Sequence, residues 1–378
     1  MKKFLFLAAS AIALISCSPK PSYQLTGKVA GADFNGKYVY MYEFGVRDAA
    51  PLDSALVQEG AFLFKGDQAS PALRVIRFGQ ADMESISPRQ TGPGQNRPYS
   101  ATIVLENAPI LVTLDTVSVV AGTIENEAIQ AFTTEMEKIN AEEVAFASSI
   151  GNFDSLTAEA KAEVEKKSEA LFNRRLDFAG KYASENPTKL SGAYVFRSFS
   201  SYLDEALQQE IIAKADSTFK AVPGIDRVIA RLEVLGKVAV GQKFTDFEMA
   251  DMEGNMHKLS EYVGQGKIVL IDFWASWCPP CRKEMPALVE LYKKYNKKGF
   301  EIVGVSLDKD KDAWVEGVKN MHMEWKQLSD LKFWESEGAA LYGVNSIPHT
   351  VLVDKDGTIL AKNLHGEELN TKLAELIK

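Results

Sequence analysis

The sequence predicts three consecutive folded parts, and the last of them carries the chemistry. Short β-branched and aromatic runs separated by glycines predict a β-rich, sandwich-like domain over residues 23–120. Apolar residues at helical spacing predict a helical region over residues 121–237, and a buried strand that leads into a helix marks a third domain, residues 238–378. The chain has 378 residues, 46% of them hydrophobic and 25% charged, which is typical of a globular protein with several cores.

The composition excludes two classes of protein. Lys and Arg number 43 against 51 Asp and Glu, a net charge of −8, so the chain lacks the basic excess that nucleic-acid binding requires. Three cysteines are too few for a small fold held together by disulfides. They are Cys17, Cys278 and Cys281.

Residues 1–16 are expected to be a bacterial lipoprotein signal peptide. Two lysines precede an apolar run, Phe4–Ile15, which is too short to span a bilayer as a helix. The segment Leu14–Cys17 resembles a lipobox, which implies that Cys17 is acylated and becomes the mature N-terminus. If an ordinary signal peptide is cut nearby instead, Cys17 is left as an unpaired thiol in an oxidising compartment.

The expected lipid anchor predicts where the protein resides. Acyl chains contribute about 0.8 kcal/mol per buried methylene, so several chains hold a protein on a membrane. Residues 17–22 would then be a short tether, and the folded parts would face the periplasm of the cell envelope. Ser18 stands in place of the aspartate associated with inner-membrane retention, which favours the outer membrane.

Six strands are expected in the β-rich domain, at the spacing of an antiparallel sandwich or curled sheet. They are Tyr23–Val29, Tyr38–Phe44, Ala61–Lys65, Ala72–Phe78, Ala101–Leu105 and Ile110–Leu114. The stretch Ser85–Ser100 contains three prolines and two glycines, which predicts an exposed loop.

The helical region is expected to contain several helices and no recognisable chemistry. One begins after Thr157, a helix-capping residue, and stops at Asn186-Pro187. Further helical runs are Leu190–Ser200, Leu203–Phe219 and Ile225–Leu235.

Two cysteines follow a buried strand in the last part of the chain. The apolar run Lys267–Phe273 leads into Trp277-Cys-Pro-Pro-Cys281. A cysteine in the first turn of a helix faces free backbone N–H groups and the positive end of the helix dipole, which stabilise a thiolate. With two intervening residues, Cys278 and Cys281 lie one turn apart and can close a disulfide. This spacing predicts redox chemistry.

Two other readings of the cysteine pair stay open. A zinc site needs two more ligands at metal spacing, but no second cysteine pair exists and the four histidines are scattered. Those histidines are His257, His322, His349 and His365. The pair could also be inert thiols. The redox reading implies no metal and no organic cofactor.

The motifs together resemble the thioredoxin superfamily, specifically the TlpA/ResA-like envelope thiol-disulfide oxidoreductases. The matching features, in order and spacing, are Asp272–Ala275, Trp277–Cys281, Pro286, and Ile347-Pro348 before an apolar strand. The resemblance covers residues 238–378 and implies an α/β thioredoxin fold there. The β-rich region ahead of it resembles a domain of unknown function that often precedes such modules in lipoproteins.

The resemblance implies roles for four residues. Cys278 corresponds to the exposed nucleophile, and Cys281 resolves the mixed disulfide. Asp272 matches the buried acid that carries a proton to or from Cys281, although a partly solvated aspartate at a strand end is the alternative. Glu284 matches an active-site acid of ResA-like proteins, but it follows Arg282 and Lys283 and could belong to a solvated helix face.

Three residues are expected to contact substrate. Pro348 matches the family's cis-proline, and the backbone of Ile347 would pair with an extended substrate segment. Trp277 is a candidate for substrate contact, whereas Trp274 is more readily a core residue. His349 is expected to be structural. The implied partners are protein thiols or disulfides of the envelope, an upstream redox partner that recharges the cysteine pair, and the membrane that holds the anchor.

Two functions other than disulfide exchange fit parts of the sequence. A peroxiredoxin carries a threonine three residues before its reactive cysteine, but that position is Ala275 here. A non-enzymatic binding or assembly lipoprotein could carry a vestigial thioredoxin module, but the intact cysteine pair, Asp272 and Pro348 argue against this reading. The sequence therefore favours an anchored disulfide reductase or isomerase.

Overall fold

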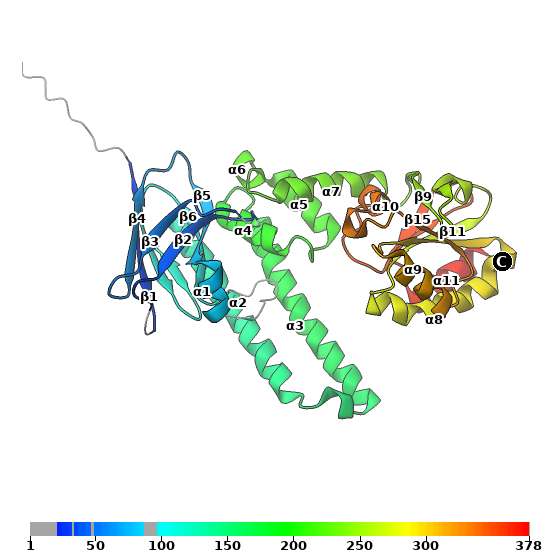
Figure 1. Cartoon of the computed structure of the whole chain (residues 1–378), viewed down its shortest axis with the longest axis horizontal. Helices are drawn as coiled ribbons and strands as arrows, with labels where there is room; N and C mark the ends of the chain where they lie inside the picture. Colours follow the sequence, from blue (N-terminus) through cyan, green and yellow to red (C-terminus); the bar gives the residue numbers. More distant parts are fainter. Residues whose placement is uncertain (1–20, 32–33, 47–48, 87–96, 378) are drawn as a thin grey trace, which may run out of the picture. The chain divides into compact units, whose positions relative to one another are not determined.

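The computed structural model describes residues 21–31, 34–46, 49–86 and 97–377, so Cys17 and the expected signal peptide lie outside it. The chain forms two compact units, Met1–Ile225 and Asp226–Lys378 (Figure 1). Within the described ranges, no helix has both the length and the apolar character needed to cross a bilayer.

Two four-stranded sheets form the β-rich part of the first unit, with the orders β4-β1-β7-β8 and β3-β2-β5-β6. Their strands are β1 (Tyr23–Val29), β2 (Tyr38–Glu43), β3 (Asp53–Leu56), β4 (Ala61–Gly66), β5 (Ala72–Phe78), β6 (Ser100–Leu105), β7 (Pro109–Leu114) and β8 (Val119–Ala121). Side chains of β1 alternate between buried and exposed, as expected for a strand with one face on a core.

The structure confirms the β-rich fold and adds short elements that the sequence pattern did not predict. The strands β3 and β8 have only four and three residues, too few to show a clear alternation. The helix α1 (Gln80–Ile86) occupies the beginning of the stretch expected to be a loop. Most of that stretch, residues 87–96, lies outside the described ranges.

Helices complete the first unit. They are α2 (Ile124–Ser149), α3 (Ala158–Glu185), α4 (Leu190–Phe199), α5 (Glu205–Lys214) and α6 (Ser217–Lys220), with a 3-10 turn, η1 (Phe153–Ser155), between α2 and α3. Figure 1 shows α2 and α3 extending together away from the sheets. The buried Arg175 of α3 contacts Asn140 and Glu143 of α2, which ties the two helices together.

One expected helix is divided in two. The run Leu203–Phe219 was predicted to be continuous, but α5 ends before Ala215, whose backbone is extended. The carboxylate of Asp216 then accepts a hydrogen bond from the backbone N–H of Phe219 and caps α6. Such a cap competes with helix continuation, and the apolar pattern does not reveal it.

The second unit is built around a seven-stranded sheet of order β10-β9-β13-β12-β11-β14-β15. Its strands are β9 (Glu248–Ala250), β10 (Met256–Lys258), β11 (Ile268–Trp274), β12 (Phe300–Ser306), β13 (Lys326–Ser329), β14 (His349–Val353) and β15 (Ile359–Lys362). Its helices are α7 (Ile225–Lys237), which begins at the last residue of the first unit, α8 (Pro279–Tyr295), α9 (Lys311–Asn320), α10 (Glu337–Leu341) and α11 (Gly366–Leu376), with 3-10 turns η2 (Leu259–Glu261), η3 (Asn296–Lys298) and η4 (Phe333–Glu335).

The central strand β11 determines where the site lies. It pairs in parallel with β12 and antiparallel with β14, and all seven of its residues are buried. The order β12-β11-β14-β15, with α8 directly after β11 and α11 at the end, is the thioredoxin arrangement and confirms the fold class expected for this part of the chain. Because α8 starts at the carboxyl end of β11, its first turn projects from that edge of the sheet.

Candidate active site

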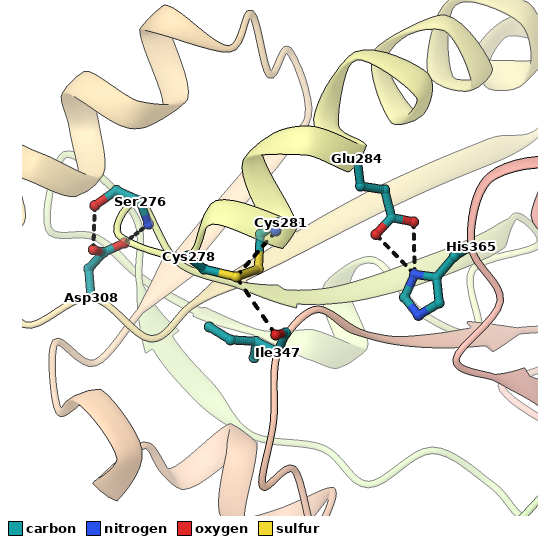
Figure 2. Close-up of a disulfide and its surroundings, with 7 residues drawn as sticks. All are labelled: Ser276, Cys278, Cys281, Glu284, Asp308, Ile347 and His365. Atoms are coloured by element: carbon teal, nitrogen blue, oxygen red, sulfur yellow. Dashed lines mark hydrogen bonds and ion pairs between the residues drawn. A yellow bond between two sulfur atoms is a disulfide. The ribbon is translucent and has the colours of Figure 1, made fainter. Parts of the chain in front are cut away.

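A disulfide joins Cys278 and Cys281 at the start of α8 (Figure 2). Cys278 is the N-cap residue, and its sulfur accepts a hydrogen bond from the backbone N–H of Cys281 at 3.2 Å. Pro279 and Pro280 occupy the first helical positions, where a missing N–H costs little. The N–H of Cys281, which would stabilise a Cys278 thiolate, is therefore already directed at this sulfur.

Both sulfur-bearing residues are buried, which corrects the expectation of an exposed Cys278. Cys278 is 3% exposed and Cys281 is 1% exposed. The Sγ atom of Cys278 lies 3.7 Å from the carbonyl oxygen of Ile347, so the loop before β14 covers it (Figure 2).

The loop before β14 contains the cis-proline that the resemblance implies. The Ile347-Pro348 peptide bond is cis, and the side chain of Ile347 packs partly buried against the core of the second unit.

Asp272 lies in β11 with 1% of its surface exposed. The pKa of this carboxyl is raised from 3.8 to about 7, mainly by burial and in part by the negative charge of Glu284, while His365 opposes the rise. Within the described part of the chain, Oδ2 of Asp272 has no hydrogen-bond partner. A carboxyl in this environment gains and loses a proton near neutral pH, as a proton carrier must.

Glu284 lies on α8 and is paired with His365, which is the N-cap residue of α11 (Figure 2). The Nδ1 atom of His365 lies 2.8 and 2.9 Å from the two carboxylate oxygens of Glu284. The hydrogen bond to Glu284 raises the pKa of His365, and the charges of Glu284, Asp272 and Glu368 add to that rise, while partial burial opposes it. Glu284 is thus held by a partner and does not lie on a freely solvated helix face.

The other histidine near the sulfurs behaves differently. His349 follows Pro348 and is 9% exposed, with its ring 6.0 Å from that of Phe273. The pKa of His349 is lowered to about 4, mainly by burial and in part by the charges of Lys362, His365 and Arg231. His349 is neutral at pH 7.

A buried carboxylate fixes the chain just before the cysteines. Asp308, which follows β12, accepts hydrogen bonds from the backbone N–H and the hydroxyl of Ser276 at 2.9 and 2.6 Å (Figure 2). It also accepts one from the hydroxyl of Ser306 at 2.7 Å. The neighbouring Trp274 is fully buried and donates from Nε1 to Gln327 at 3.0 Å, so it is a core residue.

Trp277, in contrast, is 42% exposed and packs on two aromatic side chains that come from η4. Its ring centroid lies 5.0 Å from that of Phe333 and 6.1 Å from that of Trp334.

Several of these residues carry no signal in the sequence. His365 and Glu284 are 81 residues apart, and Asp308 is 32 residues from Ser276. Their contacts depend on the order of the strands in the sheet. Asp308 follows β12, which is next to β11, and His365 follows β15, which is separated from β11 by β14. Among the described residues, no group of three or more His, Cys, Asp or Glu is arranged to hold a metal ion.

Comparison with known families assigns both ends of the chain. Residues 240–362 match the AhpC/TSA family, and residues 23–129 match a domain of unknown function, DUF4369. The second match confirms the resemblance expected for the β-rich region. Ala275, which stands where a peroxiredoxin carries its threonine, is buried.

The chain is also similar to individual thiol-disulfide oxidoreductases. The thiol-disulfide oxidoreductase ResA of Bacillus thuringiensis is 36% identical over 142 residues, which cover 38% of this chain and 79% of that protein. ResA of Geobacillus thermodenitrificans is 36% identical over 122 residues, 32% of this chain and 67% of that protein. A solved thioredoxin domain of a thiol-disulfide oxidoreductase from Bacteroides vulgatus is 33% identical, with a TM-score of 0.35, and covers 37% of this chain and 99% of that one.

A thioredoxin fold with a closed Cys-X-X-Cys disulfide at the start of the helix that follows its central strand defines a thiol-disulfide oxidoreductase. The relatives show to which family of these enzymes the chain belongs. Because the chain covers 79% of a ResA protein at 36% identity, it belongs to the ResA family of thiol-disulfide oxidoreductases.

Proposed function

We propose that this oxidoreductase is a lipid-anchored enzyme of the bacterial envelope that exchanges the Cys278/Cys281 dithiol with disulfides of other proteins. The observation that carries the proposal is the position of Cys278 Sγ. It lies between the N–H of Cys281 at 3.2 Å and the carbonyl oxygen of Ile347 at 3.7 Å. A substrate sulfur that approaches along the Ile347 backbone meets Cys278 Sγ, whose thiolate form is stabilised by the N–H of Cys281.

The proposed reaction has two steps that balance in sulfur and electrons. The thiolate of Cys278 attacks one sulfur of the substrate disulfide, which forms a mixed disulfide and releases the other substrate sulfur as a thiolate. Cys281 then loses its proton and attacks Cys278, which forms the Cys278–Cys281 disulfide and releases the second substrate thiolate. The substrate gains two electrons and the enzyme loses two, so a dithiol donor of the envelope must reduce the enzyme again.

Asp272 is the proposed acceptor of the Cys281 proton. Its pKa of about 7, raised by burial, suits proton exchange with a thiol. The backbone of Ile347 and the cis-proline Pro348 are proposed to hold the substrate beside Cys278, and Trp277 to contact its side chains. Glu284 is proposed to act on Asp272 through its charge.

Insulin reduction tests the activity. The protein with dithiothreitol should precipitate insulin B chain faster than dithiothreitol alone, and Cys278→Ser should abolish the acceleration. A reduction potential near about −270 mV would indicate a reductase, and one near about −120 mV an oxidase. A protein that does not accelerate insulin reduction, in either redox state, would contradict the proposed exchange.

The anchor is a separate part of the proposal and rests on the Leu14–Cys17 pattern alone. Mass spectrometry of the mature protein from a bacterial host should find an acylated Cys17 as the first residue. The Cys17→Ala variant should then leave the membrane fraction. An unmodified N-terminus downstream of Cys17 would disprove the anchor and leave the redox proposal intact.

A further inference from the structure

Three aromatic side chains gather on the surface next to the disulfide. Trp277, Phe333 and Trp334 form this aromatic patch, in which Phe333 and Trp334 have ring centroids 5.9 Å apart and each contacts Trp277. Trp277 and Trp334 are each 42% exposed. Among the described residues of the second unit, the other large apolar side chains with comparable exposure are Val240 and Met256, neither of them aromatic.

The loop that carries the patch has an unfavourable backbone. Leu331 and Phe333 both have φ of 56°, a left-handed conformation that branched and aromatic residues rarely adopt. Hydrogen bonds fix the loop in this form: the hydroxyl of Ser329 accepts from Leu331 N at 3.1 Å, and the carboxylate of Asp330 accepts from Glu337 N at 2.8 Å. The loop thus keeps Trp334 at the surface, where its burial contributes little to stability, and a role in binding accounts for this placement.

One residue of the patch is the chain neighbour of the reactive cysteine. Trp277 immediately precedes Cys278, the N-cap residue of α8. The carbonyl oxygen of Ile347 lies 3.7 Å from the sulfur of Cys278. A polypeptide whose cysteine reaches Cys278 therefore has its neighbouring residues beside the patch.

We propose that the aromatic patch binds a large apolar side chain next to the cysteine of an extended polypeptide substrate. This inference rests on the proposed function and narrows its substrate class to unfolded or incompletely folded proteins, because folded proteins bury most such side chains. Indole and phenyl faces take up apolar and aromatic groups by stacking and edge contacts, without demanding one particular partner. Small disulfides that lack an apolar side chain gain nothing from the patch.

Two disulfide-linked peptide dimers test the proposal. The peptides are identical except for the residue beside cysteine, which is Phe in one and Ser in the other, and each dimer presents two equivalent sulfurs. The reduced protein should react with the Phe dimer about tenfold faster than with the Ser dimer, measured as second-order rate constants. In Trp334→Ala this ratio should fall to about two, and Trp334→Phe should keep most of it.

Met256→Ala is the matched control, because it removes an exposed apolar side chain from β10, outside the patch. It should keep the full ratio. A ratio near one in the wild type, a full ratio in Trp334→Ala, or an equal loss in Met256→Ala would overturn the inference. If the wild type reduces neither dimer, the proposed function itself fails. If it reduces both at the same rate, only the inference about the patch fails.

Discussion

Glu284 and His365 form an ion pair across 81 residues of sequence, with Nδ1 of His365 at 2.8 Å from one oxygen of Glu284. Both charges act on the buried carboxyl of Asp272, the negative one raising its pKa and the positive one lowering it. The hydrogen bond to Glu284 raises the pKa of His365, which favours the protonated, positively charged form of this histidine. The pair can therefore adjust the pH at which Asp272 gives up its proton.

The two members of this pair should shift the pH dependence of activity in opposite directions. His365→Gln leaves Glu284 unpaired and so raises the pKa of Asp272, whereas Glu284→Gln removes the negative charge and lowers it. The inflection of the rate against pH should move up in the first variant and down in the second, each by about half a pH unit to one unit. Single-turnover oxidation of the reduced protein between pH 5 and 9 measures both shifts.

Other charges around His365 need a control. Glu368 on α11 faces His365, and Lys362 on β15 acts on the nearby His349. Glu368→Gln should move the inflection less than Glu284→Gln, because Glu284 makes the hydrogen bond. Equal shifts in the same direction for His365→Gln and Glu284→Gln would show that the pair acts through local structure and not through charge.

The hydrogen bonds from Ser276 to Asp308 should contribute to the stability of the fold. Asp308→Ala leaves the N–H and hydroxyl of Ser276 and the hydroxyl of Ser306 without their acceptor, at a cost of about 2–4 kcal/mol in the free energy of unfolding. Ser276→Ala removes one of these bonds and should cost about 1 kcal/mol. Urea denaturation followed by circular dichroism compares the two. Similar losses in the free energy of unfolding for both variants would mean that Ser306 and water replace the hydrogen bonds to Asp308.

The sequence predicted the strands and helices that are marked by apolar runs and capping residues. The buried run that became β11 is apolar along its whole length except for Asp272, and the cysteine pair directly follows it. Helix α3 begins after Thr157, whose side chain accepts from the N–H of Ala160, and ends with Asn186 as its C-cap residue. Capping residues and unbroken apolar runs are local signals, so a single sequence reveals them.

Contacts between distant segments could not be predicted in the same way. His365 looked like an isolated histidine, because its partner Glu284 comes from another helix. Trp334 follows Phe333 in a loop with no motif, and only folding brings both rings to Trp277. The burial of Cys278 depends likewise on the Ile347 carbonyl, 69 residues away. Such features follow from the sheet order, which the pattern of one chain does not specify.

Cys278 should be the more reactive thiol of the reduced enzyme, even though both cysteines are buried. Its sulfur receives the N–H of Cys281 at the helix start, which stabilises the thiolate. Iodoacetamide at pH 7 should therefore alkylate the Cys281→Ser variant at least tenfold faster than the Cys278→Ser variant. The same reaction in urea, where both thiols are exposed, provides the reference. Faster labelling of Cys281 in the folded protein would reverse the assigned roles.

Asp272→Asn should slow turnover and stabilise the fold. The folded protein keeps the Asp272 proton up to about pH 7, whereas the unfolded chain loses it near pH 3.8. Between these values the folded state binds more protons, so wild-type stability falls as pH rises, by at most about 4 kcal/mol at pH 8. Asparagine removes this dependence, so the variant should gain stability relative to wild type at pH 8 and not at pH 3.5, as thermal unfolding at the two pH values will measure.

The same variant should reduce the rate of mixed-disulfide resolution by about 10² to 10⁴, the usual contribution of a general base. Resolution is followed by trapping the mixed disulfide with acid and separating it from the oxidised enzyme. Glu284→Gln is the matched control, because it removes a second acid of the site while leaving Asp272 as acceptor. If Asp272→Asn keeps full activity and Glu284→Gln loses it, Glu284 carries the proton. If neither change alters the rate above pH 7, solvent reaches Cys281 directly, and the buried position of Asp272 then has no part in the chemistry.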